Sequence, residues 1–517
     1  MNNLISEKVI LIICTVFTAL FILILKFKKF KKNNAKAFFF IYLDLILCIL
    51  IIYFLQNTFL IEHLIMITSI IFLLICFIIF KLLKLYNNKI GVYFVMFTIL
   101  IIQLGYIAYT PFFQRQHDSR SFVEYQYGGH FGYMGYIFFN KHLPNGSPQQ
   151  YWCFYNPPLF YILSVIIIKF QNLCGIELEN CLENLQMFSV IYTMIFNIYI
   201  YKILKEMNIK KSIIYIMSFV GLAPAMIIMS GSLNNDILSI MLSTMAIFYT
   251  IKWYKEDSLK NLIKIAITIS LAMMTKISSA LIAVSIAVVF LKKVISNINN
   301  LKSYIRNFAI FAIIALPIGM WFPVKNLILY DIPFTYVQSV DEDNEANISK
   351  YSIFDRVLNI FQKENLISKN IIMTGDYQDN NILITTTKSF IVDENINYKD
   401  NFILKTAINF EFYCTIIIII LFLINLIYVL VENKKINNYW ILYFLLVLVL
   451  ELFSYIKFCF DYPFVFTMNF RYIVPILISF SVITGIACEN NKKLQYINNI
   501  FLSIFSILSI IIFTNLV

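Results

Sequence analysis

Gln114-Arg115-Gln116-His117-Asp118 opens the segment that decides the fold, and Gly128-Gly129-His130 and Phe154-Tyr155-Asn156-Pro157-Pro158-Leu159 follow it. This segment comes directly after a hydrophobic run over 89–110. It contains three of the four histidines of the chain, together with acids, arginines and many aromatic side chains. Polar groups that gather at one membrane surface, rather than being spread through the bilayer, indicate chemistry on a substrate held in that surface. We therefore expect an enzyme.

The rest of the chain is typical of a membrane protein. Of its 517 residues, 60% are hydrophobic and 14% are charged. Hydrophobic runs of about 18 residues or more recur along the whole length, and each is long enough to cross roughly 30 Å of hydrocarbon. The sequence predicts an all-α polytopic membrane protein with about 14 transmembrane helices, rather than several soluble domains.

The net charge of +12 does not indicate nucleic acid as a partner. The basic residues lie in short clusters between hydrophobic runs, which is the pattern of cytoplasmic loops in membrane proteins. These clusters are Lys26, Lys28, Lys29, Lys31, Lys32 and Lys36; Lys202, Lys205, Lys210 and Lys211; Lys292, Lys293, Lys302 and Arg306; Lys434 and Lys435; and Lys492 and Lys493. Their positions place the segment 111–157 on the extracytoplasmic side.

The expected spans follow from the hydrophobic runs and these clusters. They are 8–26, 37–56, 61–81, 89–110, 184–205, 212–230, 236–254, two short helices within 261–292, 304–325, 409–431, 439–456, 471–488 and 498–516. The domain division has four parts: extra N-terminal helices over 1–88, a membrane module over 89–325 with a catalytic loop at 111–183, an extracytoplasmic loop or cap over 326–408, and C-terminal helices over 409–517.

Shorter elements are expected outside these spans. The apolar run 158–170 is too short for a full crossing and predicts an in-plane or re-entrant helix, and 131–142 also has a helical pattern. In the hydrophilic segment 326–408, the pattern predicts an amphipathic helix over 351–362 and a strand over 382–392. We expect this segment to form a small cap over the outer face.

Asp118 is the first candidate for a chemical role. A carboxylate at the membrane surface can take a proton from an acceptor hydroxyl or amine, or hold a divalent metal ion such as Mg²⁺ or Mn²⁺. His117 and His130 could orient an acceptor or bind the metal. The alternatives are a solvated loop acid for Asp118 and an interfacial histidine in an aromatic belt for His130. Asn156 is either a helix N-cap or a contact within the site.

A second set of candidates consists of cations near the outer ends of spans. Arg471 opens a hydrophobic span from the outside, and its guanidinium suits a lipid phosphate, although it could simply anchor the span. Lys276 and Lys325 lie where cytoplasmic lysines are not expected, which indicates anion binding, and Arg115 is a further cation beside His117. Asn235, Asp236 and Tyr472 could line the same cavity, or the first two could cap a helix.

Two carboxylates lie inside or near hydrophobic runs. Asp44 and Glu451 are of this kind. Ionisable residues within the bilayer often have a function, but a structural hydrogen bond is an equal possibility for each. The sequence lacks a P-loop, a dinucleotide fingerprint, an HExxH motif and a serine-nucleophile elbow.

Several of these motifs, in this order, resemble the C-type fold (GT-C) glycosyltransferases, and most closely the bacterial relatives of protein O-mannosyltransferases and the aminoarabinose lipid A transferases. The resemblance covers about 90–490. The matching motifs are Gln116-His117-Asp118, the turn from Ser232 to Asp236, Thr275-Lys276, and Arg471-Tyr472 with Pro475. The family's His-Pro-Pro-Leu stretch is here Asn156-Pro157-Pro158-Leu159, so the role of that histidine does not carry over.

The resemblance implies an inverting transfer of a sugar from a polyprenyl-phosphate donor, on the extracytoplasmic side of a bacterial plasma membrane. Asp118 would activate the acceptor, and Arg471 with Lys276 or Lys325 would stabilise the departing lipid phosphate. The acceptor, which could be a protein, a lipid or a glycan, and any need for a divalent cation stay open. The alternatives are a transporter or flippase of lipid-linked saccharides, an oligosaccharide polymerase or ligase, and a non-catalytic envelope scaffold.

Overall fold

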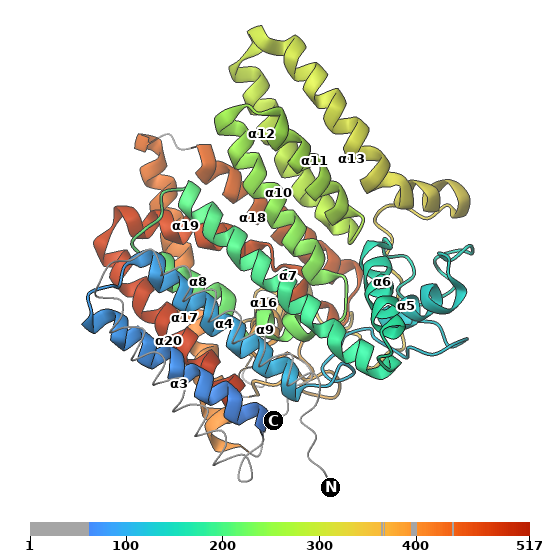
Figure 1. Cartoon of the computed structure of the whole chain (residues 1–517), viewed down its shortest axis with the longest axis horizontal. Helices are drawn as coiled ribbons and strands as arrows, with labels where there is room; N and C mark the ends of the chain where they lie inside the picture. The colour runs from blue at the N-terminus through green and yellow to red at the C-terminus, as the bar shows by residue number, and fades with distance from the viewer. Residues whose placement is uncertain (1–60, 363–365, 367, 394–400, 437–438, 517) are drawn as a thin grey trace.

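The structure, a computed structural model, describes residues 61–516 except 363–365, 367, 394–400 and 437–438. In these residues the chain is all-helical, and its only β-type pairing is an isolated bridge between Asn347 and Phe464 (Figure 1). The all-α membrane fold expected from the sequence is confirmed. The expected spans 8–26 and 37–56 lie outside the described residues.

Long apolar helices make up most of the described chain. Nine of the described helices are long and apolar enough to cross a membrane. They include α3 (Ile61–Leu82), α4 (Asn88–Tyr109), α7 (Leu178–Glu206), α10 (Asp236–Glu256), α12 (Ala280–Ser296), α13 (Leu301–Tyr330), α17 (Phe402–Ile436), α18 (Tyr439–Asp461) and α20 (Lys492–Asn515). A tenth span is formed if α8 (Ile213–Leu222) and α9 (Pro224–Gly231) are taken together, since they are bent by 50° where Pro224 interrupts the helix.

The expected count of about 14 spans is not confirmed. Two predicted spans are outside the described residues, and two others correspond to α11 (Leu259–Met273) and α19 (Ile476–Asn490), which have 15 residues each. A helix of that length extends over only about 22 Å, which is less than the hydrocarbon thickness. The described residues therefore contain nine span candidates, or ten if the bent pair is one span.

The two ends of the helical bundle differ in charge. The backbone N–H groups of Lys210 and Lys211 both donate to Glu489 at 2.5 Å, and Lys255 pairs with Glu206 at 2.9 Å. These contacts bring the basic ends of α7, α10 and α19 together. The loop after α4 and the start of α10 lie at the other end of the helices. The segregation of lysines seen in the sequence is thus present in the packing.

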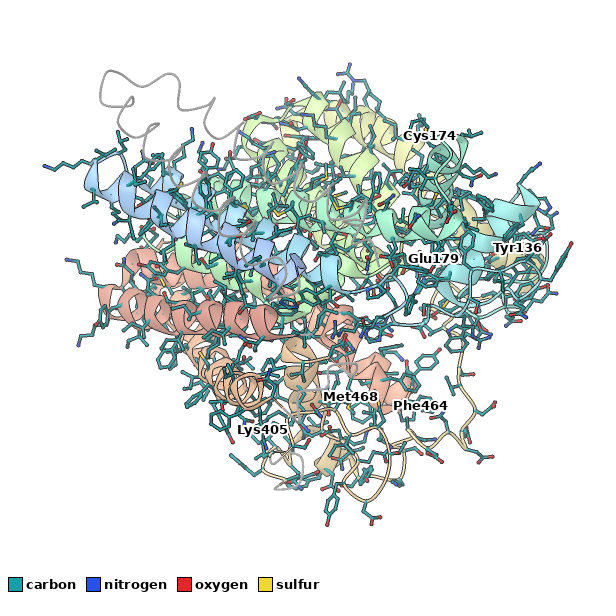
Figure 2. All side chains as sticks on the ribbon, turned by 60° about the horizontal axis from the view of Figure 1, so that its bottom comes forward. Tyr136, Cys174, Glu179, Lys405, Phe464 and Met468 are labelled. Atoms are coloured by element: carbon teal, nitrogen blue, oxygen red, sulfur yellow. The ribbon has the colours of Figure 1, made fainter. Side chains whose placement is uncertain are left out.

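Two short helices extend the loop that follows α4. They are α5 (Gly129–Asn140) and α6 (Leu159–Leu173), and they match the helices expected over 131–142 and 158–170. Figure 1 shows both beside the start of α7. Tyr136 of α5 lies at the edge of the molecule in Figure 2, beyond the long helices. The loop and its two helices therefore lie at one end of the bundle.

The strand expected over 382–392 is wrong, because this segment forms helix α16 (Ile382–Ile391). Its isoleucines and threonines predict a strand locally, but Asn381 caps the helix and Thr387 donates to the Leu383 carbonyl within it. α16 contacts α9 and α17, and lies in the middle of the bundle (Figure 1). The helix expected over 351–362 is present only as α14 (Ile353–Val357). Thus part of the segment 326–408 enters the core instead of covering it.

Candidate active site

The backbone around Asp118 is fixed by the start of α5. Asp118 has a left-handed conformation with φ of 53°, which aspartate tolerates better than most residues. Its carbonyl accepts a hydrogen bond from the His130 N–H at 2.7 Å. A Cβ atom at Gly129 would lie 2.4 Å from the same carbonyl oxygen, so only glycine fits there. The Gly128-Gly129-His130 motif therefore positions Asp118.

The Asp118 side chain meets Arg471, which lies 353 residues later in the chain. The Nη2 atom of Arg471 donates to Oδ2 of Asp118 at 2.9 Å, and Nε1 of Trp152 donates to Oδ1 at 3.3 Å. Burial alone would raise the pKa of Asp118, but the Arg471 guanidinium holds this pKa well below its usual range. The side chain remains 34% exposed, so Asp118 is an ionised and accessible carboxylate.

Arg471 also faces a second carboxylate. Its Nη1 atom is 3.9 Å from Oδ2 of Asp236, and Oδ1 of Asp236 pairs with Nζ of Lys276. Nη2 also donates to the Tyr472 hydroxyl at 2.7 Å. The buried Nε atom of Arg471 has no hydrogen-bond partner in the described part of the chain. A buried guanidinium with an unused donor is well suited to bind an anion.

A cavity opens beside these charged groups. It encloses about 350 Å³ of empty space, including the part open to solvent. Its walls come from α10, from the break between α11 and α12, from α18, and from the turn before α19. The lining residues are Asp236, Ser239, Ile240, Ser243, Lys276, Ser278, Ser279, Ile282, Glu451, Arg471, Tyr472 and Pro475. The late motif Arg471-Tyr472 and the earlier Thr275-Lys276 therefore share one hollow.

His130 is buried behind Asp118. Its Nδ1 atom lies 2.8 Å from the Tyr161 hydroxyl, and the residue is 5% exposed. Burial lowers the pKa of His130 to about 4, although Asp118 and Asp236 act in the opposite direction. At neutral pH the imidazole is therefore uncharged, and its Nδ1 atom can accept a hydrogen bond from the Tyr161 hydroxyl.

His117 is held by a residue that sequence reasoning missed. Its Nε2 atom is 2.8 Å from Oδ2 of Asp393, and both side chains are buried. Oδ1 of Asp393 accepts a hydrogen bond from Asn469 at 3.0 Å, and Ser389 accepts one from the Phe470 N–H at 2.8 Å. The end of α16 therefore connects His117, next to Asp118, with the segment Asn469-Phe470 that precedes Arg471. No local pattern marked Asp393, because its partners come from other parts of the chain.

Asn156 and Asn235 connect two motifs. Nδ2 of Asn235 donates to Oδ1 of Asn156 at 3.2 Å and to the Thr275 carbonyl at 2.9 Å. The Leu159 N–H donates to the Met274 carbonyl at 3.1 Å. The Asn-Pro-Pro-Leu turn is therefore fastened to the segment that carries Lys276. Neither asparagine is among the residues that line the cavity.

Two candidate cations do not join this group. Lys325 is a half-buried residue of α13, and in the described part of the chain it makes no hydrogen bond or ion pair with the charged groups at the cavity. Arg115 is buried, donates to the Thr110 hydroxyl at 3.0 Å, and lies 6.0 Å from the ring centre of Tyr106. Neither residue lines the cavity.

The described residues at the cavity include no cluster of three possible metal ligands. Within the described ranges, no three His, Cys, Asp or Glu side chains are close enough to hold an ion together. Asp118 and Asp236 are both engaged by Arg471, and Asp236 also by Lys276. The divalent cation expected from the sequence stays a prediction, and no step below depends on it.

Together these features define a polytopic membrane protein with acids and cations around one cavity at the helix ends. Residues 177–321 match the family described as dolichyl-phosphate-mannose-protein mannosyltransferase. The match confirms the resemblance to GT-C membrane glycosyltransferases and indicates a glycosyltransferase of this type. It includes Asp236 and Lys276, whereas Asp118 and Arg471 lie outside it. We found no match among curated proteins or among solved structures.

Proposed function

We propose that the protein is an inverting glycosyltransferase, which moves a sugar from a polyprenyl-phosphate donor to an acceptor on the extracytoplasmic side of the membrane. The observation that carries this proposal is the contact between Asp118 and Arg471, because Arg471 also lines the cavity. A transfer of this kind needs a base for the acceptor and a cation for the departing phosphate, close together at a lipid surface. This pair supplies both.

Asp118 acts as the general base in the proposed reaction. Because its pKa is held below the usual range, the carboxylate is ionised at neutral pH. It takes the proton from an acceptor hydroxyl or amine, whose heteroatom attacks the anomeric carbon. The bond from that carbon to the phosphate oxygen breaks, and the polyprenyl phosphate leaves with the electron pair. A single displacement inverts the anomeric configuration.

Arg471 and Lys276 stabilise the departing phosphate. Their positive charges lie at the cavity, and Arg471 has an unused buried donor at Nε. Fixed cations aimed at developing negative charge lower the barrier without reorganisation during the reaction. An incoming phosphate competes with Asp118 and Asp236 for the guanidinium. Binding of the donor therefore weakens the contact between Arg471 and Asp118, the base.

The sidedness of the reaction rests on the charge difference between the two helix ends. The basic ends of α7, α10 and α19 lie together, and the cavity lies at the opposite end of α10. Lysine-rich ends face the cytoplasm in most membrane proteins. This supports an extracytoplasmic cavity.

The proposal is tested with purified protein in lipid nanodiscs, supplied with polyprenyl-phosphate sugars and with membranes of its own host as the source of acceptor. We expect release of polyprenyl phosphate and a product of inverted anomeric configuration by NMR. Arg471→Lys should weaken both donor binding and turnover. Movement of intact donor across a sealed vesicle without cleavage would instead establish a flippase, and products that grow in repeat units would establish a polymerase.

A further inference from the structure

The cavity extends from the charged groups into the helical bundle. Along α10, its lining runs from Asp236 through Ser239 to Ser243. Seven residues of helix correspond to about 10 Å of depth. On α18 the lining residue is Glu451, ten residues before the helix ends at Asp461 and so about 15 Å below that end. The hollow thus reaches the level of the spans while keeping polar walls.

Glu451 has no role in the chemistry described above. It is 6% exposed, lies in an apolar helix, and accepts no hydrogen bond within the described part of the chain. Lys276 and Arg471, which carry the opposite charge, line the same cavity. Burial of a carboxylate without hydrogen-bond donors is costly, and such groups inside membranes mark binding sites. Its position on the cavity wall means that a ligand can supply the missing donors.

Serine hydroxyls cover other parts of the same wall. The hydroxyls of Ser239 and Ser279 are 2.9 Å apart, which joins α10 to the start of α12. Ser243 is 2% exposed and, in the described part of the chain, has no hydrogen-bond partner of its own. Each hydroxyl can donate one hydrogen bond and accept two, so this wall retains free capacity.

This lining does not suit the hydrocarbon chain of a lipid. Hydroxyls and a carboxylate would lose their solvation against an isoprenoid without gaining hydrogen bonds. It suits a small ring that carries several hydroxyl groups, because a carboxylate and serine hydroxyls can exchange hydrogen bonds with such a ring. Arg471 and Lys276 at the charged end would hold a phosphate attached to that ring.

We infer that this cavity binds the sugar of the lipid-linked donor, and that Glu451 accepts a hydrogen bond from a hydroxyl or amino group of that sugar. The inference rests on the proposed function and adds a residue that selects the donor. The phosphate lies at Arg471 and Lys276, and the sugar extends towards Ser243 and Glu451. The isoprenoid chain stays outside the polar hollow, in the lipid.

The test measures binding of two ligands in nanodiscs: a synthetic polyprenyl-phosphate sugar, and the same polyprenyl phosphate without sugar. Glu451→Gln should weaken binding of the sugar-bearing ligand by about 10-fold or more, because a hydrogen bond to a charged acceptor is lost. It should leave binding of the bare phosphate within about 2-fold. Arg471→Lys should weaken both. An equal loss for both ligands, or no loss for either, overturns the inference.

The same binding measurement with a neutral pentose, a neutral hexose and an aminosugar on the same lipid identifies which group of the sugar donates the hydrogen bond to Glu451. The largest loss for the aminosugar assigns an ammonium to Glu451, and equal losses for all three assign a hydroxyl. Glu411→Gln is the matched control, because Glu411 is also buried in a span but accepts its hydrogen bond from Ser509 at 2.5 Å, away from the cavity. It should leave binding of all these ligands unchanged.

The binding experiment separates this inference from the proposed function. If the wild type binds lipid-linked sugars through Glu451 but never transfers them, the cavity assignment stands and the transferase proposal fails. If transfer occurs and Glu451→Gln binds every donor normally, the transferase stands and the sugar pocket is wrong.

Discussion

The two ends of the helical bundle hold their charges in different ways. At the lysine-rich end, Lys252 and Lys255 pair with Glu206, and the exposed fractions of these side chains lie between 22% and 39%. At the cavity, Arg471 is 10% exposed and Asp236 is 4% exposed. Exposed ion pairs contribute little to stability, whereas buried charges are costly unless they are paired. The exposed charges therefore add little to stability, whereas the buried charges depend on their partners.

The largest effect in this comparison should come from Asp118→Asn. The amide has nearly the same shape but cannot take a proton, so kcat for sugar transfer should fall by about 1,000-fold or more. Turnover with a lipid-linked sugar measures this, and the melting temperature in detergent checks that the fold is kept. A loss of less than about 10-fold would remove Asp118 from the role of base.

The next effect concerns pH and His130. With a pKa of about 4 in the folded protein and about 6.5 when unfolded, His130 binds more protons in the unfolded state between these values. Stability is therefore lost as pH falls below about 6.5, and the loss reaches about 2 kcal/mol at pH 5. Asp118 does not add to the loss in this window, because its lowered pKa contributes stability that is lost only as pH falls below the usual carboxyl range.

His130→Gln should remove this part of the pH dependence. Unfolding of both proteins is followed by heating or denaturant at pH 7.5 and at pH 5, and the variant should lose less stability between the two. Parallel losses in the two proteins would show that His130 is protonated in the folded state.

A smaller effect is expected at Asp393, a positioning residue that touches neither the donor nor the acceptor in the proposed reaction. Asp393→Asn weakens the hold on His117 and Asn469, so kcat should fall by about 10-fold while KM for the donor changes little. A merely structural role would lower the melting temperature and reduce kcat only through loss of folded protein. Normal kcat per folded molecule would contradict the positioning role.

The smallest effect should come from the lysine-rich end. Lys255→Ala removes the pair with Glu206, whose side chains are 39% and 22% exposed. Turnover should change by less than about 2-fold and the free energy of unfolding by less than about 1 kcal/mol. A loss of activity comparable to that of Asp118→Asn would mean that charge at this end is also part of the catalytic machinery.

The long helices, and the proximity of several motifs that are distant in the chain, could be predicted from the sequence. Hydrophobic length and the lysine clusters predict the position of α4, α7 and α10, because each span must satisfy the bilayer independently of its neighbours. The Thr275-Lys276 and Arg471-Tyr472 motifs do meet at one cavity. The match to the mannosyltransferase family independently supports the resemblance on which that expectation rested.

The remainder depends on contacts that no local pattern records. Lys276 and Lys325 are both expected near the outer ends of hydrophobic spans, yet only Lys276 lines the cavity. Lys276 lies in a break between two helices, whereas Lys325 belongs to the continuous helix α13, and hydrophobic length gives the depth of a residue but not the direction it faces. α16 was mistaken for a strand because its β-branched residues are governed by tertiary packing.

One guanidinium shared between two carboxylates has a kinetic consequence for the proposed reaction. While Arg471 is paired with Asp118, this carboxylate is a weak base and does little to activate a water molecule. Arrival of the anionic head of the donor redirects the guanidinium and frees the carboxylate at the moment when a reactive carbon is present. In the proposed reaction the donor must therefore bind before the base becomes active. This order of binding protects a metabolically expensive donor from hydrolysis by water.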